Sequence, residues 1–259
     1  MNTIRIERDG DVLVATIDRP GSDLNAIDSE LHEDLGELMR ILKRERDARA
    51  VLLTGSKRAF SAGGDFRWFP ELRTLDRLDP LRRDAKQLIW DLLDVELPIV
   101  AAVNGPAVGL GASVALLCDV VVMAESAVIA DPHVSVGIVA GDGGAAIWPL
   151  LAGPAVAKRY LLTGDPVSSA DAVRLGLATE AVPDTELADR AMAWARRLAA
   201  GAPLAVRGTK LAVNQQLKRA LLDSFDLSTA LEIPTFLSDD HREALAALAE
   251  KRPPRFTGR

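Results

Sequence analysis

The chain has 259 residues, of which 48% are hydrophobic and 26% charged, and this balance excludes a disordered protein and favours a folded globular one. Its 37 acidic and 31 basic residues give a formal net charge of −6, which argues against a general nucleic-acid binder because such proteins carry a basic excess. The single cysteine, Cys118, excludes an internal disulfide framework and fits a reducing, cytoplasmic compartment.

The first half of the chain alternates between strand-like and helix-like segments. Residues 3–18, TIRIERDGDVLVATID, form two alternating runs joined at Asp9-Gly10, which predicts a β-hairpin. Helical spacing follows in SELHEDLGELMRILKRERDA, around residues 81–93 and in GLGASVALLCD, and short apolar strands are predicted at RAVLLTG, LPIVAAVNG and VVVMA. Helices that alternate with short apolar strands favour a parallel sheet with crossover helices, so the predicted fold class is α/β.

From Pro154 onward the sequence is almost entirely helical. Five amphipathic segments punctuated by glycine or proline are predicted: PAVAKRYLLTG, SSADAVRLG, DTELADRAMAWARRLAAG, PLAVRGTKLAVNQQLKRALLDS and HREALAALAEKR. No linker or repeat divides the chain, so one domain with a helical extension is expected. No secretion signal is visible at the N-terminus, and polar residues and glycines interrupt the most apolar region, 97–124, so no membrane span is expected.

Two glycine-containing loops share one design, in which a buried strand is followed by a turn and then a helix. They are VLLTGSKRAFSAGGDF, residues 51–66, and IVAAVNGPAVGLGAS, residues 99–113. Glycine lets backbone N–H groups approach a ligand closely, and a helix N-terminus adds partial positive charge. Two such turns side by side would aim two N–H groups at one oxygen. Each turn taken alone also fits an ordinary strand-to-helix connection, and neither is a phosphate loop or a dinucleotide fingerprint.

Four segments, which together extend over nearly the whole chain, resemble those of a known enzyme superfamily. LLTGSKRAFSAGGDF, AAVNGPAVGLGASVALLCD, LLTGDPVSSADAVRLGLATEAV and EKRPPRF resemble the enoyl-CoA hydratase/isomerase, or crotonase, superfamily in order and in spacing. The resemblance implies a crotonase-like ββα superhelix core over residues 1–195 and a C-terminal helical trimerisation region over residues 196–259, in one continuous domain. It does not specify the reaction, because the enzymes that the chain resembles include hydratases, isomerases and C–C bond hydrolases.

The same resemblance implies a substrate and an assembly. The expected substrate is a small-molecule acyl-CoA, with no cofactor apart from the coenzyme A of that substrate, and the expected assembly is a homotrimer or a dimer of trimers. No metal site, nucleic acid or membrane partner is expected.

In the enzymes that this chain resembles, two backbone N–H groups bind the thioester carbonyl oxygen and stabilise an enolate. By motif position these groups belong to Gly64, in SAGGD, and Leu110, in GLGAS. Leu110 departs from the commoner glycine, but a backbone N–H survives that change. One preorganised oxyanion donor contributes about 3 to 4 kcal/mol to transition-state stabilisation.

The two catalytic glutamates of a family hydratase are replaced in this chain. The resemblance places the first acid at Ser113 and the second at His133, and a serine is not a base near neutral pH without help. Asp142 lies in AGDGG, the turn that lines the same pocket in relatives, and an aspartate near a histidine fixes its tautomer and stabilises its charged form. We therefore expect His133 and Asp142 to act as the acid/base pair; a structural histidine and a turn or helix-cap aspartate are the alternative interpretation.

The PH and GDG signature also resembles a smaller branch of the superfamily, the β-diketone hydrolases typified by oxocamphor hydrolase. Those enzymes cleave a C–C bond without CoA, and they carry a second histidine where this chain has Leu110. Glu232, in ALEIPTF, matches a further polar active-site residue of those enzymes only weakly, and a capped or solvent-facing helix residue is the favoured interpretation. A CoA-thioester enzyme is thus the leading function, and a CoA-independent C–C hydrolase and a non-catalytic acyl-CoA-binding paralogue stay open.

Substrate-binding candidates surround the first glycine loop. The backbone around Ala62 is expected to contact the CoA nucleotide, and four basic residues are expected to bind its phosphates: Lys57, Arg58, Arg67 and Lys251. The segment 65–78 is expected to be a mobile wall of the acyl pocket, and it carries Asp65, Phe66, Trp68 and Phe69. Three aromatic side chains in that wall favour a bulky or cyclic acyl group.

Overall fold

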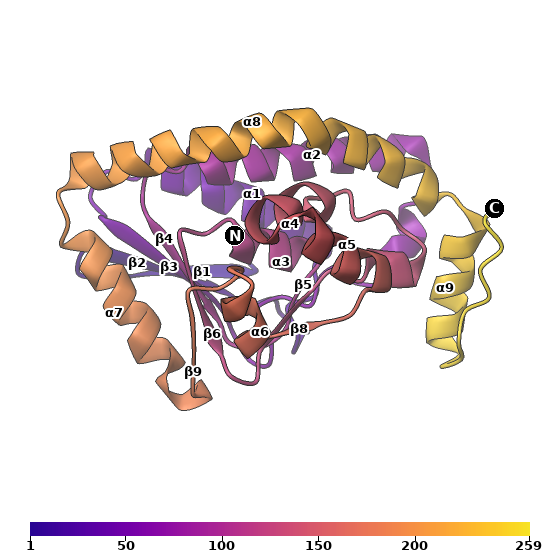
Figure 1. Cartoon of the computed structure of the whole chain (residues 1–259), viewed down its shortest axis with the longest axis horizontal. Helices are drawn as coiled ribbons and strands as arrows, with labels where there is room; N and C mark the ends of the chain where they lie inside the picture. The colour runs from indigo at the N-terminus through magenta and orange to yellow at the C-terminus, as the bar shows by residue number, and fades with distance from the viewer.

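The computed structural model describes all 259 residues, and a six-stranded sheet lies at its centre (Figure 1). Its first two strands, β1 (Ile4–Asp9) and β2 (Val12–Ile17), form the predicted antiparallel hairpin, and Gly10 adopts a φ of 59° at the turn. That left-handed conformation favours glycine, which explains the Asp9-Gly10 signal.

The remaining strands of this sheet are parallel, as the alternation of helices and strands predicts. They are β3 (Ala50–Gly55), β4 (Ile99–Val103), β6 (Val120–Ala124) and β9 (Glu180–Val182), and the strand order is β1-β2-β3-β4-β6-β9. A smaller sheet combines β5 (Ala107–Val108), β7 (Val128–Ala130) and β8 (Val167–Ser168). β4 and β6 are buried along their whole length, which explains their continuous apolar sequences.

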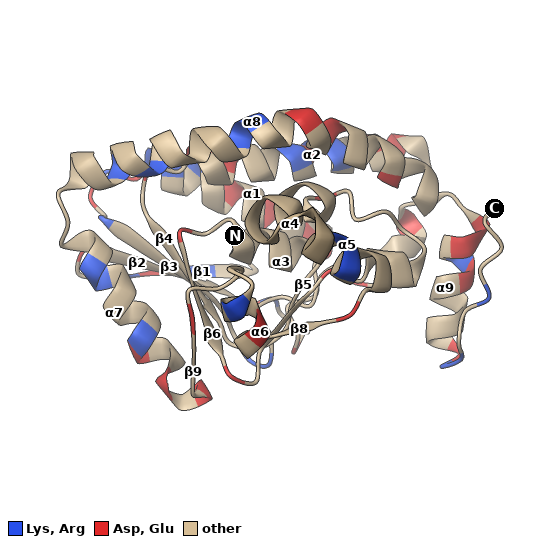
Figure 2. Ribbon diagram, viewed as in Figure 1, with Lys and Arg blue, Asp and Glu red and all other residues tan.

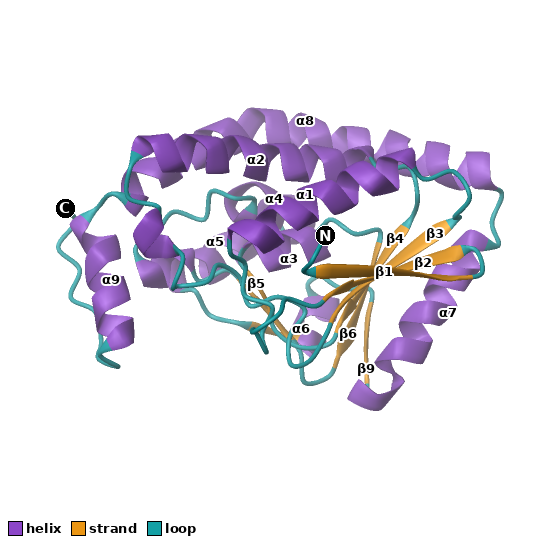
Figure 3. Ribbon diagram, turned by 180° about the vertical axis from the view of Figure 1, so that it is seen from behind, coloured by secondary structure: helices purple, strands orange, loops and turns teal.

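Three long helices stack in one layer beside the sheet: α1 (Ser29–Arg44), α2 (Leu75–Asp94) and α8 (Pro203–Phe236). Figure 1 shows α8 running across the top of the molecule above α2. On the other side, α7 (Leu187–Ala199) packs against β3, β4 and β6, as the view from behind in Figure 3 also shows. Between these layers, 61 buried side chains form one continuous core, so the chain is a single domain.

Short helices connect these layers near the middle of the molecule. They are α3 (Leu110–Leu116), α4 (Gly144–Ala152), α5 (Pro154–Thr163) and α6 (Ser169–Arg174). The 3₁₀ turn η2 (His133–Val136) precedes α4. The last helix, α9 (Asp239–Ala249), packs against η2 and stands apart from the main layers (Figure 1).

A second hydrophobic cluster, separate from the main core, lies near α9. Its four buried members, which we call the wall cluster, are Leu72, Leu78, Ile138 and Phe236. They come from the segment around α2, from the loop after η2 and from the end of α8. Because these segments are distant in the sequence, the wall cluster joins the segment that follows the first glycine loop to the end of α8.

The helical C-terminal third is confirmed, with one difference in length. The sequence predicts a helix that ends near Ser224, whereas α8 continues to Phe236 and contains Pro234. A proline deletes one backbone hydrogen bond, and here it does so only two residues before the helix ends. Residue 195, the expected end of the core, falls inside α7, so the chain has no structural break there.

Charged residues of both signs lie on the surface, as expected for a globular chain with 26% charged residues. Acidic and basic side chains share the outer helices α7, α8 and α9 (Figure 2). None of the helices has both the length and the apolar character that crossing a membrane requires.

Candidate active site

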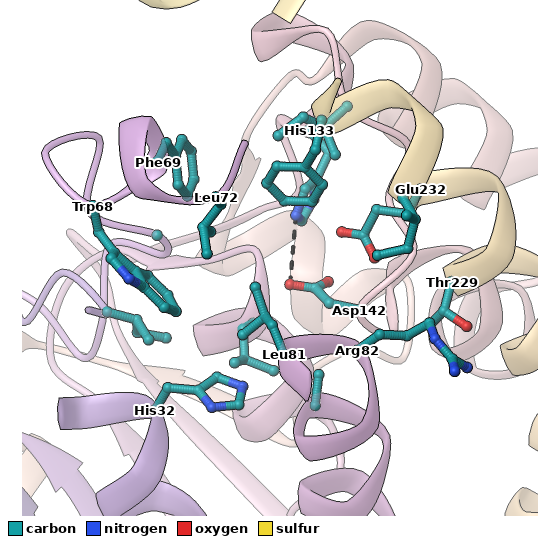
Figure 4. Close-up of a pocket in the computed structure, with 17 residues that line it drawn as sticks. His32, Trp68, Phe69, Leu72, Leu81, Arg82, His133, Asp142, Thr229 and Glu232 are labelled. Atoms are coloured by element: carbon teal, nitrogen blue, oxygen red, sulfur yellow. Dashed lines mark ion pairs between the residues drawn. The ribbon is translucent and has the colours of Figure 1, made fainter. Parts of the chain in front are cut away.

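A cavity of about 80 Å³ lies between α2, α8 and the two glycine loops (Figure 4). Its wall is largely apolar and includes three members of the wall cluster together with Trp68 and Phe69. Seven of the 17 residues that line it are polar, charged or glycine: His32, Gly64, Arg82, His133, Asp142, Thr229 and Glu232. An apolar pocket with a few convergent polar groups is the usual form of a small-molecule site.

The two glycine loops meet at this cavity because hydrogen bonds join them directly. The N–H of Ser61 donates to the carbonyl of Pro106 at 3.2 Å, and the N–H of Val108 donates back to Ser61 at 2.9 Å. This short ladder places Gly64 and Leu110 on the same cavity wall. The two strand ends that the sequence singles out are therefore neighbours in space.

Gly64 and Leu110 both present backbone N–H groups that donate no hydrogen bond within the chain. Leu110 is the first residue of α3, where helix geometry leaves the N–H free. A Cβ at position 64 would lie only 2.5 Å from the ring of Phe69, so glycine is required for that ring to pack there. The structure thus brings together the two residues predicted to form an oxyanion hole.

The ring of His133 lies between two carboxylates. Its Nδ1 is 2.5 Å from Oδ1 of Asp131, and its Nε2 is 3.4 Å from Oδ2 of Asp142. The sequence predicts the orienting role for Asp142 and gives no signal for Asp131. The structure gives the shorter contact to Asp131, which is only 1% exposed, and leaves Asp142 on the cavity side of the ring.

These two aspartates decide the charge of His133. Burial alone would lower the pKa of the imidazole, but the negative charges and hydrogen bonds of Asp131 and Asp142 outweigh burial and raise the pKa well above its usual value. The ring is therefore an imidazolium at neutral pH. A histidine in this state donates a proton or stabilises negative charge, rather than acting as a free base.

Glu232 is a functional candidate that the sequence suggests only weakly, and the favoured interpretation of it as a capped or solvent-facing helix residue is wrong. The helix α8 does not expose it to solvent: it is 8% exposed, and Figure 4 shows its carboxyl group directed toward His133 and Asp142. Burial, and then the nearby charge of Asp142, raise the pKa of Glu232 well above its usual value, so it holds a proton at neutral pH. A Cβ at Gly141 would lie 2.5 Å from its Oε2, which explains one glycine of AGDGG.

Ser113, the other vacated glutamate position, is fully buried and does not line the cavity. Its hydroxyl oxygen has no hydrogen-bond partner and lies beneath Gly143, where a Cβ would come within 2.7 Å of it. The hydroxyl is thus closed off by the turn that carries Asp142. His32, in contrast, lines the cavity beside Trp68, and burial lowers its pKa, so this second imidazole is neutral.

The aromatic segment after Gly64 is divided between the cavity and the surface. Trp68 and Phe69 line the cavity, whereas Phe66 is 46% exposed and packs edge-on against Phe69 with ring centres 5.6 Å apart. Asp65 is buried and pairs with Arg19 at 2.7 Å and with Arg67 at 2.8 Å. The hydrogen bond from Arg67, with help from Arg19, holds the pKa of Asp65 well below its usual range, so this carboxylate is held within the loop and does not line the cavity.

The predicted CoA-binding residues all lie outside the cavity. Lys57 and Arg58 are exposed beyond β3, Arg67 is exposed beside Asp65, and Lys251 is exposed after α9. The N–H of Ala62 donates to Leu24 at 2.9 Å and is not free for a ligand. Of the residues predicted to bind substrate, only Trp68 and Phe69 therefore belong to the cavity itself.

Comparison with known proteins identifies the family to which this site belongs. Residues 7–259 match the profile of the enoyl-CoA hydratase/isomerase family. The chain belongs to this family. A probable enoyl-CoA hydratase from Rhodobacter capsulatus is 36% identical over 259 residues, covering 100% of this chain and 99% of the relative.

Two solved structures are similar across most of the chain. An enoyl-CoA hydratase/isomerase from Mycobacterium paratuberculosis has 40% sequence identity and a TM-score of 0.90, covering 95% of this chain and 98% of the other. A β-diketone hydrolase from Anabaena sp. PCC 7120, bound to (S)-3-oxocyclohexyl acetic acid, has 32% identity and a TM-score of 0.85, covering 91% and 94%. The predicted superfamily and the crotonase-like α/β fold are confirmed, and the protein is an enzyme of a lyase/isomerase family.

Proposed function

We propose that this enzyme acts on an acyl-CoA thioester through an enolate that the N–H groups of Gly64 and Leu110 stabilise, with His133 and Asp142 in place of the two usual glutamates. The supporting observation is that two free N–H groups and this ionised pair line one cavity. Each oxyanion donor contributes about 3 to 4 kcal/mol to transition-state stabilisation, so the pair of donors is the largest catalytic contribution.

The protonation states of the cavity assign one role to each acid/base group. Asp142 is the carboxylate that accepts a proton, Glu232 is the neutral acid that donates one, and the His133 imidazolium holds Asp142 in place. In hydration, the water proton passes to Asp142 while the water oxygen bonds to the β-carbon. The electron pair of the double bond moves to the thioester oxygen, and Glu232 then protonates the α-carbon.

A panel of enoyl-CoA thioesters with linear, branched and cyclic acyl groups tests this proposal. Mass detection should show addition of one water, or a shifted double bond, for at least one member. His133→Ala and Asp142→Asn should abolish most of that turnover, whereas Arg58→Ala, far from the acid/base groups, should raise KM and leave kcat unchanged. Absence of any thioester product from folded wild-type protein would contradict the thioester proposal.

A second candidate is the hydrolysis of a carbon–carbon bond in a cyclic β-diketone. It is supported by the small and mainly apolar cavity, from which all four predicted CoA-binding cations are absent, and by the likeness to the Anabaena hydrolase. Water would attack one ketone carbon and give its proton to Asp142. The bond to the central carbon would break, the electron pair would form an enolate held by the same N–H groups, and Glu232 would protonate the central carbon.

The same assay separates the two candidates. Cyclic β-diketones should yield ring-opened keto acids with one added water if the second candidate holds, with no requirement for CoA. Competition by free CoA against the thioester, but not against the diketone, would identify thioester binding. Turnover of neither substrate class would favour the non-catalytic acyl-CoA-binding alternative.

For the assembly, we propose a homotrimer or a dimer of trimers in which α8 contacts neighbouring subunits. The support is a set of exposed leucines on α8, among which Leu204, Leu222 and Leu227 are 88%, 65% and 62% exposed. Sedimentation of the wild type and of a triple Leu→Ser variant at these positions measures the state. A monomeric wild type would refute the proposal.

A further inference from the structure

His241 lies on the first turn of α9 and is only 3% exposed, although it belongs to a helix that stands apart from the main layers. Its Nδ1 is 2.7 Å from the carbonyl oxygen of Val136. Because a carbonyl only accepts hydrogen bonds, Nδ1 must carry the hydrogen. Nε2 is buried without a partner, and burial lowers the pKa of the ring, so His241 is a neutral donor in one defined tautomer.

The acceptor of this hydrogen bond belongs to the turn that carries His133. His133 is the first residue of η2 and Val136 is the last, and the N–H of Ile138 closes the turn on the carbonyl of His133 at 3.0 Å. The carbonyl of Val136 accepts no backbone hydrogen bond. His241 therefore holds the end of η2 opposite to His133, at a carbonyl that nothing else in the chain satisfies.

The backbone itself is shaped to let α9 approach η2. Gly137, the residue after η2, adopts a φ of 70°. A Cβ at this position would come within about 3 Å of the backbone of Asp240 and His241. Since real Cβ atoms rarely approach backbone so closely, only glycine allows the first turn of α9 to pack on η2.

The same imidazole also contacts the oxyanion side of the cavity. Its centre is 5.7 Å from the ring of Phe69 and 5.5 Å from the ring of Phe236. Phe69 in turn lies directly against the α-carbon of Gly64, where no Cβ would fit. One side chain thus contacts both an aromatic ring beside one oxyanion donor and the turn that carries His133.

We propose that His241 is a positioning residue for the active site: its Nδ1–H fixes η2, and hence the ring of His133 between Asp131 and Asp142, while its ring packs Phe69 against Gly64. The C-terminal helix is then part of the catalytic framework. The proposal rests on the proposed function only in taking His133 as a catalytic residue. A shift of about 1 Å at a reacting group lowers turnover by about 10²-fold, which sets the expected scale.

Three variants test this proposal. His241→Phe keeps an aromatic ring but deletes the donor, and His241→Asn restores a donor near the position of Nδ1 without the ring. Ser238→Ala is the matched control, because it removes the side chain that caps α9 and accepts from the N–H of His241 at 3.0 Å, yet it touches neither Val136 nor Phe69. Circular dichroism and thermal unfolding check that each variant is folded.

The first readout needs no substrate. The proton in the short hydrogen bond between His133 Nδ1 and Asp131 should give a strongly downfield proton NMR signal, assigned by its loss in Asp131→Asn. We expect His241→Phe to shift or broaden this signal, His241→Asn to restore part of it, and Ser238→Ala to leave it unchanged. A wild-type signal in folded His241→Phe would refute the proposal.

The second readout uses whichever substrate the wild type turns over. His241→Phe should lower kcat by about 10- to 100-fold with little change in KM, and His241→Asn should recover part of kcat. An equal loss of kcat in Ser238→Ala would show that helix stability alone matters, and would overturn the positioning role. Failure of the proposed function would appear differently, as full turnover in His133→Ala, while the NMR readout would still test His241.

Discussion

The two sides of the cavity are built in different ways. On one side, backbone N–H groups of Gly64 and Leu110 are held by parallel strands and by the hydrogen bonds between their loops. On the other side, His133 is held by side chains: Asp131 behind the ring and Asp142 in front. A backbone N–H remains when its own side chain is replaced by any residue except proline. In the side-chain cluster, by contrast, one substitution removes a charge or a hydrogen bond on which the other members depend. We therefore expect different mutational responses on the two sides.

The largest effect is expected on the side-chain side. His133→Ala should lower kcat by about 10²-fold or more, because Asp142, the proton acceptor, loses the cation that holds it in place. The cost is large because the substitution also leaves the buried carboxylate of Asp131 and the half-buried carboxylate of Asp142 without their shared cation. Steady-state kinetics normalised to folded protein measures it. Wild-type kcat in the folded variant would show that the histidine is structural.

The oxyanion side is tested by comparing two substitutions of one residue. Leu110→Pro deletes the N–H and should lower turnover by about 10²- to 10³-fold, whereas Leu110→Ala keeps the N–H and should change kcat far less. Proline is tolerated in the first turn of a helix, so α3 should still form. Circular dichroism provides that control. Equal losses in both variants would mean that the leucine side chain matters and the N–H does not.

Glu232 lies on the side-chain side, but it is expected to act in its neutral form. Glu232→Gln keeps the shape and cannot give a proton, so turnover should fall by about 10²-fold. The pKa of Glu232 is raised in the folded state, so its protonated carboxyl group contributes to the free energy of unfolding. This contribution is fully present below the unfolded pKa and is lost as pH rises through the folded value. Glu232→Gln should remove that loss, which urea unfolding from pH 4 to 9 measures. Identical pH dependence of stability in the two proteins would contradict burial of the carboxyl group.

The dependence of turnover on pH tests whether His133 on the side-chain side acts in its charged form. The raised pKa of His133 means that the ring is charged at low and neutral pH and loses its proton only as pH rises through the folded value. Turnover that needs the imidazolium should therefore fall on the alkaline limb. Asp142→Asn removes one charge that raises this pKa, so the limb should move to lower pH. A limb that stays in place would show that Asp142 and His133 are not coupled.

The smallest effect is expected at Ser113, which belongs to neither side. Ser113→Ala removes a buried hydroxyl that has no partner, so kcat should be unchanged and stability should rise by up to about 1 kcal/mol. Kinetics and urea unfolding measure both quantities. A decrease in kcat of about 10²-fold, the effect of losing a general acid or base, would show that Ser113 takes part in catalysis.

The order of helices and strands could be predicted from the sequence because apolar periodicity and glycine turns are local signals. The oxyanion pair, Gly64 and Leu110, and the pair His133 and Asp142 came from motif position, and the structure places all four on one cavity. Glu232 could be matched to an active-site residue only weakly, since an isolated glutamate on a long helix gives no local sign of burial.

Asp131 was missed for a different reason. It lies two residues before His133, and only the turn at Pro132 brings its carboxylate back to the histidine ring. His241 reaches η2 from more than 100 residues away, which no local pattern encodes. The contacts that depend on the packing of distant segments are thus the ones that the sequence analysis lacks.

The hydrogen bonds that join the loop of Ser61 to Pro106 and Val108 have a consequence for the evolution and design of this enzyme. The two oxyanion donors are tied to one another through backbone alone, so their spacing does not depend on the side chain at position 110. Leu110 lines the cavity, and its side chain can change in size or polarity while the N–H beside it stays in place. Position 110 therefore offers a way to alter which substrates fit without rebuilding the groups that stabilise the enolate.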